Sequence, residues 1–260
     1  MSGPLHVVPG PLSLLWLGAG AALIAGGVAL FASSQHDHET RVAIRVDCSA
    51  GVGCPLAESL ALDVWSENRS ATLPLDVVVP KSALADLEDA GASFVVLEAD
   101  IDAVAHAEAE RLAVTANVMG GDWFAEFRDY RAIEQHLQEL AEQYPQRASL
   151  HGIGTSLDGR TLWALRVGGA HDDDLPMLIN GTQHAREWIA AMTATCVADR
   201  LVTEYDSDPA IRTLVDSTEV WLVPVVNPDG YQYSWGQDRY WRKNRSGGHG
   251  VDLNRNFSVA

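Results

Sequence analysis

A strongly apolar stretch, residues 219–226, most constrains what this chain can fold into. Most of it is the run Val-Trp-Leu-Val-Pro-Val-Val, which is typical of a strand buried on both faces in the middle of a sheet. Such a sheet needs helices on both faces, and alternating strands and helices supply them. The exception in the run is Pro224, because proline cannot donate a hydrogen bond to a neighbouring strand.

The residues from 129 onward show the alternation that this strand requires. Apolar residues one helical turn apart predict a helix that Pro145 ends: Ile133, Leu137, Leu140 and Tyr144. Further elements are predicted as strands over 148–154, 161–167 and 176–179 (the last a buried strand) and as helices over 187–205 and 208–215. We therefore predict an α/β domain with its ligand site at the carboxyl ends of the strands.

Polar side chains follow the strand predicted at residues 176–179. His184 and Glu187 lie three residues apart in the stretch Asn-Gly-Thr-Gln-His-Ala-Arg-Glu-Trp-Ile. Imidazole and carboxylate groups bind zinc, and catalytic zinc sites have three protein ligands and an open position. The pair is therefore half of a candidate zinc site, although a surface His and Glu at a helix start is the alternative. Asn227 ends the next strand in a turn at the same edge of the sheet.

The N-terminal part of the chain predicts a location outside the cytoplasm. Residues 12–32 form an uncharged apolar run of 21 residues, long enough for a transmembrane anchor, and residues 1–34 also suit a signal peptide with a cleavage site. The rest of the chain is then secreted, periplasmic or tethered to a membrane through residues 12–32. Cys48 and Cys54 can form a disulfide if the compartment is oxidising.

A small α+β unit is predicted over residues 40–115, followed by a linker over 116–128. Its predicted strands and helices, including a strand over residues 60–65, are typical of a split β-α-β, ferredoxin-like sandwich. The net charge of the chain is −17, which argues against a nucleic-acid partner, because phosphate binding needs clustered Lys and Arg.

Four motifs in order carry a resemblance to a known family: the His184 stretch, Val-Asn-Pro-Asp-Gly at 226–230, Trp-Arg-Lys-Asn-Arg-Ser at 241–246 and Gly-Val-Asp-Leu-Asn-Arg-Asn-Phe at 250–257. They resemble zinc metallocarboxypeptidases of the carboxypeptidase A/B family (peptidase family M14). Residues 41–112 also resemble the activation propeptide of that family, through Leu-Asp-Val-Trp at 62–65 and similar segments. The resemblance implies a carboxypeptidase-like domain over 129–260, with a mixed sheet flanked by helices.

The resemblance also implies a zinc exopeptidase, made as a proenzyme, that acts on peptide or protein C-termini. A planar guanidinium suits a terminal carboxylate, and a fixed one stabilises the charge that develops on a scissile carbonyl oxygen. The implied roles are Zn²⁺ binding by His184 and Glu187, lining of the cleft by Arg186, contact with the scissile carbonyl oxygen by Arg242, and binding of the substrate carboxylate by Asn254 and Arg255.

The sequence departs from the family after residue 257. The family places a third zinc ligand, a His, and a general-base Glu further along the chain, whereas this sequence ends at Ala260. His249 precedes Asn254 and does not match the position of that ligand. We therefore expect an incomplete catalytic domain with little or no activity of its own. The alternatives are a zinc deacylase of N-acyl amino acids and a catalytically dead, membrane-tethered module that binds peptide C-termini.

Overall fold

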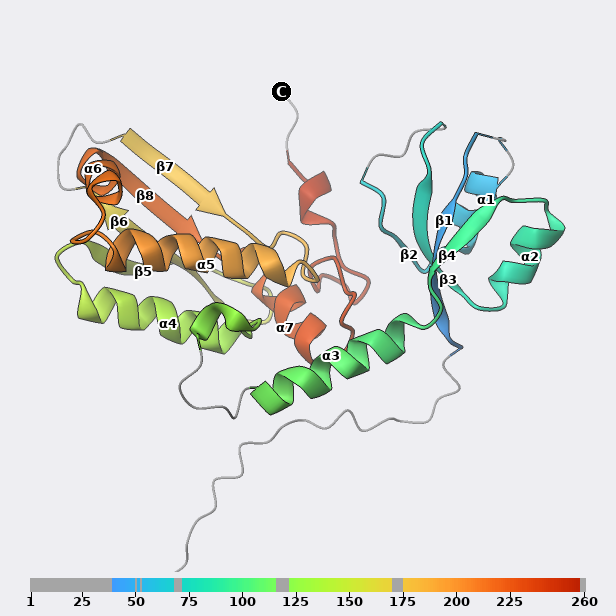
Figure 1. Cartoon of the computed structure of the whole chain (residues 1–260), viewed down its shortest axis with the longest axis horizontal. Coiled ribbons are helices and arrows are strands. Elements are labelled where there is room, and N and C mark those ends of the chain that lie inside the picture. Colours follow the sequence, from blue (N-terminus) through green and yellow to red (C-terminus); the bar gives the residue numbers. More distant parts are fainter. Residues whose placement is uncertain are drawn as a thin grey trace, which may run out of the picture. The chain divides into compact units, whose positions relative to one another are not determined.

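The structure, a computed structural model, describes residues 39–49, 51, 53–67, 72–115, 122–169 and 175–257. Two four-stranded sheets organise this part of the chain, one in residues 39–115 (the small-sheet region) and one in residues 122–257 (the large-sheet region) (Figure 1). The predicted signal peptide or membrane anchor, residues 1–34, lies outside the described residues. Among the helices that are described, none is both long and apolar enough to cross a membrane.

The small-sheet region is an antiparallel sheet in the order β2-β3-β1-β4. Its elements are β1 (Arg41–Val46), α1 (Gly53–Leu60), β2 (Asp63–Val64), β3 (Leu75–Pro80), α2 (Ala83–Asp89), β4 (Phe94–Glu98) and α3 (Ile101–Thr115). Alternate residues of β1 point to opposite faces: Ile44 packs in one cluster with α1 and α2, whereas Ala43 packs with Ile101 at the start of α3. This two-residue period explains why helices cover both faces.

Two details of the small-sheet region differ from the sequence-based expectation. The strand predicted over residues 60–65 is a two-residue strand, β2, and the first residue of the predicted range, Leu60, ends α1. A disulfide between Cys48 and Cys54 joins the end of β1 to α1, so the pairing that the sequence left open is formed. Gly53 starts α1 where the chain is tightly packed, since a Cβ there would lie 2.9 Å from the Cβ of Ala92.

The large-sheet region is a mixed sheet in the order β5-β6-β8-β7, as the predicted fold class requires. Neighbouring strands are antiparallel except β7 and β8, which run parallel. Its elements are η1 (Trp123–Ala125), α4 (Tyr130–Gln143), β5 (Ala148–Thr155), β6 (Thr161–Gly168), β7 (Leu175–Asn180), α5 (Trp188–Thr203), α6 (Pro209–Ser217), β8 (Thr218–Val223), α7 (Pro228–Gly236) and η2 (Leu253–Arg255).

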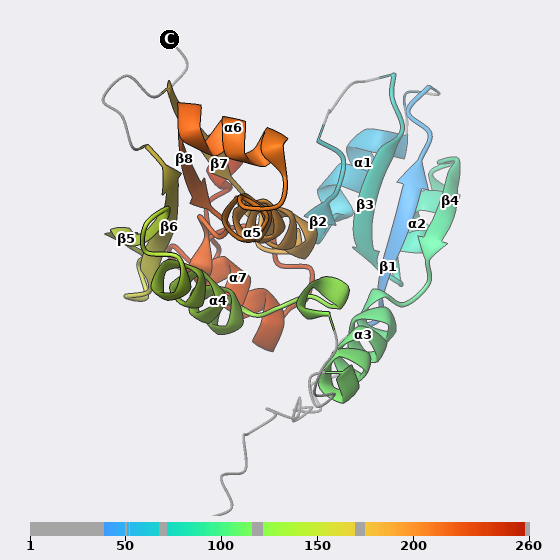
Figure 2. The same ribbon diagram turned by 60° about the vertical axis from the view of Figure 1, so that its left-hand side comes forward.

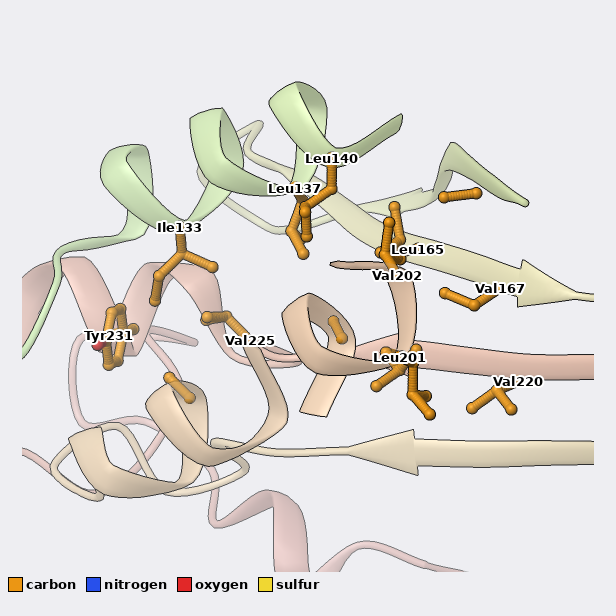
Figure 3. Close-up of a cluster of buried hydrophobic side chains, with 14 of the residues drawn as sticks. Ile133, Leu137, Leu140, Leu165, Val167, Leu201, Val202, Val220, Val225 and Tyr231 are labelled. Atoms are coloured by element: carbon orange, nitrogen blue, oxygen red, sulfur yellow. The ribbon is translucent and has the colours of Figure 1, made fainter. Parts of the chain in front are cut away.

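Helices α4 and α5 lie on the same face of the large sheet (Figure 2). Asp129 starts α4 by accepting a hydrogen bond from the backbone N–H of Ala132, at 2.8 Å. Ile133, Leu137 and Leu140 then line one side of the helix and pack in one buried cluster with Leu165 of β6, and Leu137 and Leu140 are the two that lie toward Leu165 (Figure 3). The predicted apolar face of α4 is thus confirmed, and burying it fixes the helix on the sheet.

Three expectations about the large sheet are corrected. β8 ends at Val223, so Pro224 lies just beyond the strand, where its missing N–H costs no ladder hydrogen bond. The segment predicted as a turn starts α7 instead: Asn227 is the N-cap and Pro228 the first helical residue. The strand predicted as buried, β7, lies at the edge of the described sheet, and the side chain of Leu178 is 63% exposed.

Asp229, in the first turn of α7, is a buried carboxylate that fixes the β5–β6 hairpin to this helix. It is 4% exposed and accepts hydrogen bonds from Ser156 Oγ (2.7 Å), the backbone N–H of Asp158 (3.0 Å) and Arg160 Nη1 (2.6 Å). Burial alone would raise the pKa of Asp229, but these hydrogen bonds outweigh it and lower the pKa. The pair with Arg160 therefore persists at neutral pH.

We expect the substitution Asp229→Asn to destabilise the fold by about 2–3 kcal/mol near pH 7, because it removes the charge that Arg160 and the two other donors contact. A carboxyl group whose pKa is lower in the folded than in the unfolded protein stabilises the fold at pH values above its unfolded-state pKa. This stabilisation is lost as the pH falls through the folded-state pKa. The difference between wild type and variant in urea unfolding should therefore shrink below about pH 4.

The control for this experiment is Asp158→Asn, since Asp158 contacts the same Arg160 but its side chain is 52% exposed. An exposed ion pair contributes little, so the stability of this variant should stay close to that of the wild type. If Asp229→Asn lowered the free energy of unfolding by the same amount at pH 7 and at pH 3, the charge of Asp229 would not be the source of the stabilisation.

Candidate metal and carboxylate-binding site

The parallel pairing of β7 and β8 brings their carboxyl ends to the same edge of the sheet. β7 continues into the loop that carries His184, and β8 continues into Asn227 at the start of α7. Asn227 is 2% exposed, and its Nδ2 donates hydrogen bonds to the carbonyl oxygens of Gln183 and Lys243, both at 3.1 Å. Asn227 is thus a buried link between the His184 loop and the Arg242 segment, not a surface turn residue.

Two further hydrogen bonds to backbone carbonyl oxygens hold the same loop in place. The Oγ1 of Thr182 donates to the carbonyl oxygen of Pro224 at 2.8 Å, and Thr182 has a positive φ of 63°, a conformation that non-glycine residues seldom adopt. The N–H of Ala185 donates to the carbonyl oxygen of Arg242 at 2.8 Å. These contacts hold His184 and Arg242 in register with each other.

The side chains of His184 and Glu187, the pair that the sequence analysis named as candidate zinc ligands, lie next to one another. His184 Nδ1 lies 2.7 Å from Glu187 Oε1, and His184 is only 5% exposed. The other ring nitrogen, Nε2, is buried without a hydrogen-bond partner among the described residues, and its nearest carboxylate oxygen is Asp252 Oδ1 at 3.3 Å. A buried imidazole between carboxylates fits a divalent metal, whose charge these groups would balance, and the nitrogen and oxygen donors suit Zn²⁺.

Glu67, which follows β2 in the small-sheet region, is one of two site residues that the sequence did not suggest. Ligand atoms of Glu67, His184 and Glu187 all lie within 4.8 Å of one another. Glu67 Oε1 is 2.7 Å from Arg242 Nη2, and Glu67 Oε2 is 2.7 Å from Arg255 Nη2. Burial alone would raise the pKa of Glu67, but its hydrogen bonds with Arg255 and Arg242 outweigh that effect and lower the pKa.

Arg242 is the central cation of the site. Its side chain is 10% exposed, its Nε lies 3.0 Å from Asp252 Oδ2, and its Nη1 lies 3.8 Å from Glu187 Oε1. Burial also works against the charge of Asp252, yet the hydrogen bond from Arg242 lowers the pKa of that carboxyl. Arg242 therefore neutralises a group of carboxylates that would otherwise repel one another.

The other residues that the sequence analysis named differ in exposure and in their partners. Arg242 and Arg255 line one open hollow of about 390 Å³ together with Val64, Ser66, Lys243 and Asp252. Asn254 and Arg255 are exposed and belong to η2, where the N–H of Asn254 donates to Asp252 Oδ1 at 2.9 Å. Arg186 forms an ion pair with Asp63, and its guanidinium lies 5.8 Å from the centre of the Trp65 ring.

Asp252 and Glu67 are the two residues that sequence reasoning missed. Asp252 stands inside the motif Gly-Val-Asp-Leu-Asn-Arg, so its place beside Asn254 was a usable signal. Glu67 carries no local pattern, because its partners lie more than a hundred residues along the chain. A carboxylate that contacts the second nitrogen of a ligand His orients the ring and raises its basicity, which is the position that Asp252 occupies.

The chain is similar to known carboxypeptidases. Residues 133–260 match the family model described as zinc carboxypeptidase. Carboxypeptidase A4 of Mus musculus is 31% identical over 216 residues, which are 78% of this chain and 51% of that protein. The inactive metallocarboxypeptidase ECM14 of Ajellomyces capsulatus is 39% identical over 144 residues, 52% of this chain and 24% of that protein.

Among solved structures, carboxypeptidase A from Helicoverpa armigera superposes with a TM-score of 0.73 at 27% identity, covering 86% of this chain and 59% of that one. The mixed α/β fold is therefore that of the carboxypeptidases. The chain spans about half the length of the curated relatives it matches.

We expect Asp252→Asn to weaken Zn²⁺ binding by about 10- to 100-fold, because the His184 ring would lose its charged neighbour. Competition titration with a chromophoric chelator measures this affinity. The matched control is Asp199→Asn, which changes a carboxylate 2.9 Å from His136, a second His–Asp pair outside the site. Equal losses in the two variants would contradict a specific role for Asp252.

Proposed function

Because residues 133–260 belong to the zinc carboxypeptidase family, peptidase family M14, we propose that the protein containing this chain is a zinc metallocarboxypeptidase that removes residues from peptide and protein C-termini. The observation that carries this proposal is the hollow that Arg242 and Arg255 line, next to the His184–Glu187 pair. Guanidinium groups beside metal-binding donors suit a substrate whose free carboxylate must lie near its scissile bond.

Each residue has a distinct task in this reaction. His184 and Glu187 would hold Zn²⁺, which when bound would polarise the scissile carbonyl and lower the pKa of a water. Arg255, with Asn254 beside it, binds the terminal carboxylate and so fixes the register of the peptide. Arg242 donates to the carbonyl oxygen as negative charge develops on it. Arg186 contacts the peptide along the cleft.

The small-sheet region acts in this proposal as an inhibitory propeptide. Its Glu67 carboxylate forms ion pairs with Arg242 and Arg255, the two groups that a substrate carboxylate and carbonyl oxygen would need. Its Asp63 forms an ion pair with Arg186. Substrate binding and docking of the small-sheet region therefore compete for the same cations, and cleavage in the linker (residues 116–128) would release the inhibition.

The same proposal places the protein outside the cytoplasm. The Cys48–Cys54 disulfide supports this location, because disulfides persist in oxidising compartments. A membrane tether through residues 12–32 lies outside the described residues and is not needed for the proposed activity.

Cleavage can be separated from the two alternative functions by the choice of substrate. A metallocarboxypeptidase hydrolyses a peptide with a free C-terminus and spares the amidated peptide, whereas a deacylase prefers an N-acyl amino acid. A binding module retains peptide without turnover and without a need for zinc. One matched relative is named as inactive, so binding and turnover both have to be measured.

We expect Arg255→Gln to lower kcat/KM for peptides with a free C-terminus by roughly 30- to 100-fold, because it removes a charge-assisted contact to the substrate carboxylate. Steady-state hydrolysis by the protein without its small-sheet region is the measurement. Arg200→Gln is the control, since Arg200 pairs with Glu204 on the exposed face of α5. An unchanged kcat/KM in Arg255→Gln would refute the assigned role.

Asp63→Asn tests the inhibitory role separately. It removes the ion pair with Arg186 and should raise the basal peptidase activity of the uncleaved protein several-fold, with no effect once the small-sheet region has been removed. Basal activity equal to that of the uncleaved wild type would count against this contact as part of the inhibition.

A further inference from the structure

We propose that Arg239 is a positioning residue for Glu187. Its guanidinium group holds the residues on either side of Glu187 and so fixes the direction of the carboxylate that the proposed function assigns to Zn²⁺. This inference rests on the proposed zinc function and deepens it, because it adds a residue that acts on a metal ligand through that ligand's two chain neighbours.

The backbone at Glu187 needs support from outside the helix that follows it. Glu187 is the N-cap of α5, with φ −84° and ψ 63°, and its side chain forms no capping hydrogen bond. Its N–H donates to the carbonyl oxygen of His184 at 3.2 Å, and its carbonyl oxygen accepts from the N–H of Ala190 at 2.9 Å. Glu187 therefore lies between a loop and a helix, where the regular hydrogen bonds of a helix do not set its direction.

Arg239, which lies three residues after α7, reaches both neighbours of Glu187. Its Nη1 donates to the carbonyl oxygen of Arg186 at 2.9 Å. Its guanidinium carbon lies 3.6 Å from the centre of the Trp188 ring, which makes a close cation–π contact. One planar group thus binds the residue before Glu187 and the residue after it, and the Arg239 side chain is only 17% exposed.

The Trp188 ring is itself held firmly, so it gives Arg239 a rigid surface. Trp188 is 4% exposed, and its Nε1 donates to Ser234 Oγ at 2.8 Å. The Trp235 ring stacks on it with 4.0 Å between ring centres and 11° between ring planes. A stacked ring and a guanidinium group at these distances occupy opposite faces of Trp188. Rotation of the start of α5 would therefore break both contacts.

The direction of Glu187 matters because few contacts hold its carboxylate. The side chain is 43% exposed, and its Oε1 lies 2.7 Å from His184 Nδ1 and 3.8 Å from Arg242 Nη1. Residues behind a metal ligand that fix its orientation commonly contribute about 10- to 100-fold to metal affinity. Arg239 has this position relative to Glu187, although it acts through a backbone carbonyl and a ring and not through the carboxylate itself.

Arg239 also forms an ion pair with Glu108 of α3, in the small-sheet region. This pair uses Nε, whereas Nη1 binds the carbonyl oxygen of Arg186 and the flat side of the group faces Trp188. A guanidinium has five N–H donors and two faces, so it can contact all three partners at once. Removal of the Glu108 carboxylate should thus leave the positioning of Glu187 intact.

The experiment compares the protein that contains this chain with its Arg239→Gln and Arg239→Lys variants, since neither new side chain is a planar cation. Hydrogen–deuterium exchange of the metal-free protein follows the amide of Ala190, which donates to Glu187. We expect exchange at Ala190 to become at least about tenfold faster in both variants, because the start of α5 opens more often. The amides of β6 and β8 should exchange as in the wild type.

Metal binding is the second measurement on the same variants. Zn²⁺ affinity from chelator competition should fall about tenfold in both, the lower end of the effect of residues behind a metal ligand. The visible absorption spectrum of bound Co²⁺ should change in shape, because Glu187 no longer has one fixed direction.

Two control variants isolate the role of Arg239. Arg212 of α6 makes the same kinds of contact, since its Nη2 donates to the carbonyl oxygen of Asp206 at 2.9 Å and its guanidinium lies 5.4 Å from the centre of the Tyr205 ring. Arg212→Gln and Glu108→Gln should both keep the wild-type exchange at Ala190 and the wild-type Zn²⁺ affinity. Losses in Glu108→Gln equal to those in Arg239→Gln would overturn the proposal, because the ion pair with α3 would then explain them.

The remaining outcomes separate this inference from the proposed function. If Arg239→Gln or Arg239→Lys keeps the wild-type exchange, affinity and Co²⁺ spectrum, the positioning role of the planar group fails and the zinc site stands. Faster exchange throughout β6 and β8 would also overturn the proposal, since a general loss of stability would explain it. If the wild-type protein binds no Zn²⁺ at micromolar concentration, the proposed function fails, and exchange at Ala190 decides whether Arg239 positions Glu187.

Discussion

The buried guanidinium of Arg242 is the interaction on which the candidate site depends. It contacts Asp252 and Glu67 closely and Glu187 at longer range. Without this cation, the carboxylates would gather around His184 with little to offset their repulsion. Arg242 also lies in the segment whose backbone receives hydrogen bonds from Ala185 and Asn227, so its position is set by the fold as well as by its charge.

The sheet supplies the rigid frame for that interaction. Parallel pairing of β7 and β8 places the His184 loop next to the start of α7, and the buried amide of Asn227 connects both to the Arg242 segment. Asp229, two residues further on, ties α7 back to the β5–β6 hairpin. The site is therefore held by backbone and amide contacts that do not involve a ligand, which is the support that a preorganised site requires.

A cation surrounded by carboxylates also makes the site open to competition. The groups suited to a peptide carboxylate are bound here by Glu67 of the same chain, and Arg186 is bound by Asp63. In the proposed function, one set of charges would serve both recognition of a peptide carboxylate and inhibition by the small-sheet region, because any carboxylate of the right reach satisfies the same guanidinium groups. The strength of the inhibition would depend on how far each ion pair is shielded from water.

The sequence by itself determined several helices and strands and the pairing of residues that are close together in the chain. Residue periodicity predicted α4, the strands β5 and β6, and α5, because local patterns of apolar residues follow helix and strand geometry. His184 and Glu187 were named as candidate zinc ligands from their spacing, because residues three positions apart in one loop lie close together. Only the tertiary structure decided the edge position of β7, the burial of Asn227 and the arrival of Glu67 and Asp252 beside His184. These features depend on contacts between residues far apart in the chain, which leave no periodic signal in the sequence.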